Sequence, residues 1–114
     1  MTRSPNPPAP AVRHITLRMT TAEMLELMRY RALCEQASGR PLALQAVLRS
    51  ALITHSEATI DVKPYIGLRS KRIDLVANAS VQAALKHLQA NPGHEYAAIT
   101  DLVLGCVRLA GSRV

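Results

Sequence analysis

The sequence RHITLRM at residues 13–19 decides the fold. Its apolar side chains strictly alternate with polar ones, and the apolar set comprises Ile15, Leu17 and Met19. A period of two is typical of a β-strand that buries one face and exposes the other. A strand this short cannot satisfy its backbone groups alone, so the sequence also predicts a partner strand elsewhere in the chain.

Two helices are expected directly after this strand. Thr20 and Glu23, three positions apart, form a capping box that begins the first helix, and Gly39 ends it. Pro41 suits the first turn of a second helix. The apolar stripe of that second helix ends near His55.

The same order of elements recurs after a polar linker at residues 56–64. The sequence IGLR at 66–69 is similar to ITLR at 15–18, which favours a second strand over 65–70 with Ser70 as the cap of the next helix. Antiparallel pairing of the two strands would form a two-stranded ribbon.

A second register for this strand stays open. Residues 72–77 also alternate, so they could form the strand, with Asn78 or Ser80 capping a shorter helix. The longer repeat similarity and the position of Pro64 before an edge strand favour the first register. In either register, a fourth helix is expected from about Glu95 to the end of the domain.

The sequence therefore predicts a mostly helical α+β fold, with a two-stranded antiparallel ribbon and four helices. Residues 13–111 form one domain of two repeats, 13–55 and 65–111, joined by the linker. Residues 1–12, which hold four of the seven prolines, are expected to form a disordered arm.

Composition limits the partner that such a domain can bind. The 114 residues include 14 Lys and Arg against 8 acidic residues, a net charge of +6 that favours a polyanion such as nucleic acid. With three Tyr and neither Trp nor Phe, the chain lacks the stacking surface of a single-strand binder. These observations fit a nucleic acid that is bound without base stacking, and the charge fits a solvated basic surface equally well.

Other classes of function find little support in the sequence. Cys34 and Cys106 fall in apolar helical contexts, which predicts buried, reduced thiols rather than a disulfide or metal site. No Gly-rich phosphate loop or metal-ligand spacing is present, so we expect neither an enzyme nor a cofactor. No apolar run approaches a membrane span or a signal peptide, and a cytoplasmic protein is expected.

Residues 14–52 resemble a ribbon-helix-helix unit of the MetJ/Arc type. The resemblance rests on the ITLRM strand, the capped helix, a Gly-Arg turn and the sequence LQAVLRSAL at 44–52. It implies a tandem pseudo-dimer that inserts its ribbon in the major groove. Single-chain tandem members act in plasmid conjugation and in T-DNA transfer by the virulence system of Agrobacterium. The resemblance thus implies an accessory role in DNA processing and transfer, with a relaxase or another DNA-transfer protein as a partner.

The predicted ribbon presents side chains that can read bases in the major groove. On the 65–70 register they are His14, Thr16, Arg18, Tyr65 and Arg69. The resemblance implies phosphate binding at the start of the second helix, by the backbone of Leu42 and Ala43 with Arg40 nearby and by Glu95 and His94 in the second unit. Basic residues that flank the ribbon and could bind phosphates are Arg13, Lys63, Lys71 and Arg72.

Two other functions remain compatible with the sequence. A transcriptional repressor or antitoxin would share the DNA contacts. A helical protein-interaction module would instead use the basic surface to bind an acidic partner, and it would more often expose apolar side chains on the ribbon. Because both predicted repeats lie in one chain, we expect a monomer with internal pseudo-twofold symmetry.

Overall fold

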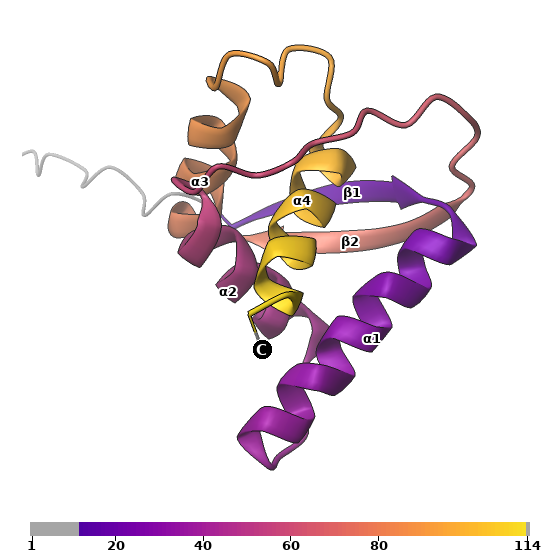
Figure 1. Ribbon diagram of the computed structural model, residues 1–114, viewed down its shortest axis with the longest axis vertical. Coiled ribbons are helices and arrows are strands. Elements are labelled where there is room, and N and C mark those ends of the chain that lie inside the picture. The colour runs from indigo at the N-terminus through magenta and orange to yellow at the C-terminus, as the bar shows by residue number, and fades with distance from the viewer. Residues whose placement is uncertain (1–11, 114) are drawn as a thin grey trace, which may run out of the picture.

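The computed structural model describes residues 12–113 and has a mostly helical α+β fold (Figure 1). Most of the predicted N-terminal arm, residues 1–11, lies outside the described residues. The predicted fold class, with four helices and one two-stranded antiparallel sheet, is confirmed. In chain order the elements are β1 (Arg13–Met19), α1 (Thr21–Ser38), α2 (Leu44–His55), β2 (Lys71–Ala77), α3 (Ala79–Gln89) and α4 (Ile99–Gly111).

Strands β1 and β2 pair along their whole length. Arg13 lies opposite Ala77, Thr16 opposite Asp74 at the centre, and Met19 opposite the first residue of β2. The predicted strand 13–19 is therefore confirmed, as is its antiparallel pairing with a distant segment.

The favoured register of the second strand is wrong. Residues 65–70 form neither helix nor strand, and the strand is 71–77, close to the register that the sequence left open. Burial explains the difference: Ile66 and Leu68 are 98% and 85% exposed, whereas Leu75 and Ala77 are fully buried. Alternation alone could not distinguish the two segments, because only the packing of the helices shows which apolar set is covered.

Corresponding caps follow the two strands. In α1, Thr20 Oγ1 accepts from the backbone N–H of Glu23 at 3.0 Å, and Glu23 Oε1 accepts from the N–H of Thr20 at 2.8 Å. In α3, Asn78 Oδ1 accepts from the N–H of Val81 at 2.9 Å. Asn78 is the cap of the third helix, so the favoured choice of Ser70 is wrong.

The second helix of each half begins later than expected. Helix α2 begins at Leu44, so Pro41 lies in the connection that precedes it. Helix α4 begins at Ile99 rather than near Glu95. At its start the side chain of Asp101 accepts from the N–H of Ala98 at 2.9 Å, which satisfies one of the free amides of the first turn.

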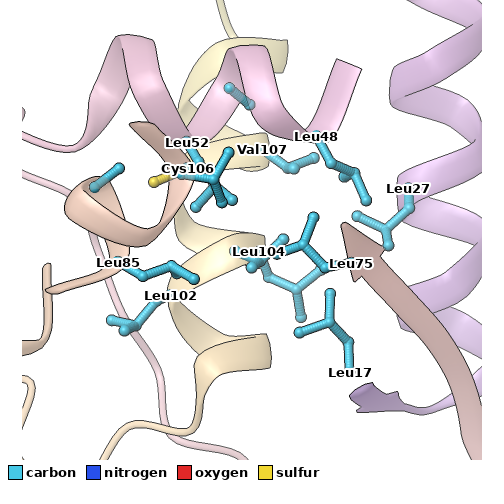
Figure 2. Packing of buried hydrophobic residues seen from close by; sticks show 14 of the residues in the cluster. Leu17, Leu27, Leu48, Leu52, Leu75, Leu85, Leu102, Leu104, Cys106 and Val107 are labelled. Atoms are coloured by element: carbon cyan, nitrogen blue, oxygen red, sulfur yellow. The ribbon is translucent and has the colours of Figure 1, made fainter. Parts of the chain in front are cut away.

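The core lies between one face of the ribbon and the helices (Figure 2). Leu17 of β1 and Leu75 of β2 are fully buried there, together with Leu104 of α4. Each such side chain stabilises the fold by about 1.5–3 kcal/mol. Helix α2 packs against β2 and helix α4 against β1, and the two helices pack on each other. The second helix of each half therefore contacts the strand of the other half.

The connection between α2 and β2, residues 56–70, is longer than the predicted linker of residues 56–64, and we call the whole connection the linker from here on. It crosses α4 at a glycine. A Cβ atom at Gly105 would lie 3.2 Å from Ile60 Cδ1 and 3.3 Å from the carbonyl oxygen of Asp61. The close approach leaves little room for a side chain and seats Ile60, 8% exposed, on the core. The linker thus packs on the domain, and the end of α1 extends away from it (Figure 1).

Candidate nucleic-acid interface

The outer side of the ribbon carries six side chains, which we call the ribbon face. They alternate with the buried residues of both strands, and five of them are exposed while Val76 is half-buried. Three cross-strand pairs make up the face: His14 with Val76, Thr16 with Asp74, and Arg18 with Arg72. The predicted positions of His14, Thr16 and Arg18 on the outer side of the first strand agree with this arrangement.

Two arginines lie directly opposite each other at one end of the ribbon face. Arg18 and Arg72 are Cα partners in the antiparallel register, and both are exposed. Like charges in this position destabilise a strand pair. An anion bound between the two guanidinium groups would remove that repulsion.

Both strands are held from the side by a polar residue near the start of a helix. Gln45 of α2 accepts from the N–H of Val76 at 2.8 Å and donates to the carbonyl oxygen of Asp74. Thr100 of α4 donates from Oγ1 to the carbonyl oxygen of Arg18 at 2.8 Å. These bonds fix the backbone of the ribbon face on both strands.

Tyr65 and Arg69 do not lie on the ribbon face. Both belong to the linker, and the Arg69 guanidinium lies 4.8 Å from the centre of the Tyr65 ring. Arg69 points toward two helix starts, where it donates to Glu23 at 2.7 and 2.9 Å and to Asp101 at 2.6 Å. The register correction therefore removes the reason for assigning base contacts to this pair.

The charge of Arg69 is balanced where it lies. Its hydrogen bonds hold the pKa of Glu23 below the ordinary value, despite the opposing effect of burial. The bond to Glu23, followed by that to Asp101, raises the pKa of Arg69 above its ordinary value. Because each carboxylate also caps a helix, Arg69 ties the linker to the starts of α1 and α4.

The predicted phosphate contacts of the first half lie in two parts of the chain. Arg13 begins β1 and is exposed. Arg40, Leu42 and Ala43 lie in the connection before α2, and the N–H of Leu42 donates to Glu35 Oε2 at 2.9 Å. One backbone amide of the predicted anion site is thus already paired with a carboxylate.

The other predicted basic residues lie in different places. Lys71 begins β2 and is exposed, whereas Lys63 lies in the linker, 3.6 Å from Asp61 in an exposed ion pair. Arg72, predicted as a phosphate contact beside the ribbon, lies on the ribbon face itself.

The second predicted anion site, at Glu95 and His94, does not lie at the start of a helix. Glu95 and His94 precede the start of α4 and do not form it. His94 Nδ1 lies 2.8 Å from the carbonyl oxygen of Leu88, and Glu95 accepts from the N–H of Gly93 at 3.0 Å. Backbone hydrogen bonds, the first within Glu95 itself, lower the pKa of that carboxyl.

The two cysteines occupy different environments. Cys106 is fully buried, and the loss of solvent raises the pKa of its thiol to about 11. Cys34 is only partly buried against the core, and both thiols are free. Among residues 12–113, no three His, Cys, Asp or Glu side chains gather as a metal site would require.

Sequence reasoning missed two members of the ribbon face, Asp74 and Val76. Two signals in the sequence could have found them. One is the alternation of 72–77, and the other is that Asn78 follows β2 as Thr20 follows β1. The bonds from Gln45 and Thr100 had no comparable signal, because they join residues far apart in the chain.

Comparisons with protein-family models, with curated proteins and with solved structures found no match for this chain. Within the described residues, no helix combines the length and apolar character needed to cross a membrane.

Proposed function

We propose that this protein binds double-stranded DNA in a sequence-specific manner by inserting the β1–β2 ribbon in the major groove. One observation carries the proposal: the ribbon buries its apolar side under α2 and α4 and exposes paired arginines on the other side. A two-stranded ribbon fits the major groove, where arginine can donate two hydrogen bonds to guanine.

The proposal includes a tandem ribbon-helix-helix architecture in one chain. Its support is the correspondence between halves: each has a strand, a capping residue and two helices in the same order. The packing of α2 on β2 and of α4 on β1 also supports it, because the second helix of each half contacts the strand of the other half. Gln45 of α2 and Thr100 of α4 both bond to the ribbon backbone from near the start of their helices. Such a protein would be monomeric, and an obligate dimer in sedimentation at micromolar concentration would contradict this part of the proposal.

The tandem of two such units in one chain resembles the single-chain members of this family, and that resemblance suggests the biological setting. We propose an accessory role in the processing and transfer of a DNA strand, with a relaxase as a partner. Footprinting on the DNA that flanks the gene and on any nearby transfer origin tests this role. Protection at a transfer origin or border supports it, whereas protection confined to the gene's own promoter favours a repressor.

DNA binding itself is tested by fluorescence anisotropy with a selected duplex and a scrambled duplex over a range of salt. Arg40→Ala and Lys71→Ala should weaken both complexes similarly and flatten the dependence of log K on log salt by about one unit each. Arg29→Ala serves as the control, because Arg29 is an exposed residue of α1 that is not among the predicted DNA contacts. Equal, salt-independent affinity for all duplexes would contradict the proposal.

A further inference from the structure

The two strands contribute different chemistry to the ribbon face. We call two positions equivalent when they hold the same place in their strands, β1 and β2. Such positions lie 58 residues apart, as Thr16 and Asp74 do. From β1 the ribbon face receives an imidazole, a hydroxyl and a guanidinium; from β2 it receives, in the same order, Arg72, Asp74 and Val76. No equivalent pair of positions is occupied by the same residue type.

Antiparallel pairing turns this difference into a polarity along the ribbon. One end carries two guanidinium groups, from Arg18 and Arg72. The other end carries His14 beside the methyl groups of Val76, and the single carboxylate of Asp74 lies between the ends. The positive charge of the ribbon face is therefore concentrated at one end.

Each section of the ribbon face suits different base edges. Arginine pairs with the O6 and N7 atoms of guanine, a carboxylate accepts from the N4 amino group of cytosine, and an apolar side chain contacts the methyl group of thymine. Thr16 Oγ1 donates to Asp74 Oδ1 at 3.2 Å, so the carboxylate at the centre is oriented and retains further acceptor positions.

We propose that the ribbon reads a non-palindromic duplex site with a fixed polarity. Guanines lie at the Arg18 and Arg72 end, a cytosine amino group faces Asp74 at the centre, and thymine methyl groups lie at the Val76 end. This inference rests on the proposed function, since it assigns the DNA sequence that the ribbon reads.

The test is selection of binding sites from a fully randomised duplex pool. The wild-type chain is compared with the triple variant Arg72→His, Asp74→Thr, Val76→Arg, which gives both strands the residues of β1. The wild type should enrich a non-palindromic sequence, whereas the triple variant, in which each end of the ribbon face pairs an arginine with a histidine, should enrich a palindrome. Arg29→Ala, on α1, is the control and should enrich the wild-type sequence.

Replacement of single base pairs then assigns the polarity. Arg18→Ala and Arg72→Ala should abolish discrimination at the same end of the site, where each wild-type guanine contact gives about five- to 150-fold preference. His14→Ala should affect the opposite end. Should the triple variant fail to fold, Asp74→Thr alone, at an exposed position, should lose only the central preference.

The outcomes separate this inference from the proposed function. A palindromic site for the wild type would overturn the polarity and leave DNA reading by the ribbon intact. Enrichment of no sequence by the wild type, or of one identical sequence by the wild type and the triple variant, would overturn both.

Discussion

Arg18 of β1 and Arg72 of β2 lie directly opposite each other on the exposed side of the ribbon, although 54 positions separate them in the sequence. The first prediction follows from this pair. Arg18→Ala and Arg72→Ala should each weaken binding to the preferred duplex by about 1–3 kcal/mol, and binding to scrambled DNA much less. Anisotropy titrations with both duplexes measure the difference. Equal losses on the two duplexes would show that the ribbon does not read sequence.

Asp74→Asn should raise the affinity for scrambled DNA by about three- to ten-fold, because it removes a negative charge from the side of the ribbon that enters the groove of a polyanion. Preference for the selected site should fall at the same time, since a neutral amide replaces the carboxylate acceptor. Asp61→Asn is the matched control, because Asp61 lies in the linker and pairs with Lys63. The same gain from both variants would indicate only an effect of net charge.

Arg69→Ala should reduce the free energy of unfolding by about 3 kcal/mol, because it leaves Glu23 and Asp101 buried without their partner. Urea unfolding measures this loss. Arg108→Ala, which breaks an exposed ion pair with Glu26, should cost at most about 1 kcal/mol. Loss of DNA preference by Arg69→Ala with unchanged stability would instead restore the base-reading assignment of Arg69.

The stability of the fold should decrease as the pH falls below about 6.5, in part because of His55. Burial, followed by the charge of Arg113, lowers the pKa of His55 from 6.5, so the unfolded chain takes up the proton first. The contribution is complete above pH 6.5 and is lost as the pH falls toward the folded-state pKa. His55→Leu should reduce the change in the urea midpoint between pH 7.5 and 5.5. His87→Gln, at an exposed position, should leave that change as it is in the wild type.

Cys106 should resist alkylation in the folded protein, since its thiol is buried and its pKa is raised to about 11. Iodoacetamide at pH 7.5 should therefore label Cys34 first and Cys106 only after unfolding. Cys106→Ala should cost about 1–2 kcal/mol of stability and leave DNA affinity unchanged. Equal labelling rates in the native state, followed by mass spectrometry, would contradict the buried assignment.

The first half of the fold could be predicted from the sequence because its signals are local. The alternation of 13–19, the capping box of Thr20 with Glu23 and the glycine at the end of α1 act within a few residues of each other. Gly39 has a φ of 72°, the left-handed conformation that a glycine stop requires.

The second strand could not be predicted with the same ease, because its register depends on contacts across the chain. Arg69 reaches Glu23 and Asp101, and this placement draws 65–70 away from the ribbon. Tyr65 folds over Gly67, so a side chain there would displace the Tyr65 ring. The periodicity of the sequence reveals neither contact. The predicted site therefore included Tyr65 and Arg69, and it left out Asp74 and Val76.

The joining of both strands in one polypeptide has an evolutionary consequence. In a ribbon made by two identical chains, every substitution appears twice, and a change that improves one half alters the other. Here a mutation in β2 leaves β1 as it was, so Asp74 could arise opposite Thr16 without placing a second carboxylate beside it. Each strand is free to drift, or to be selected, on its own.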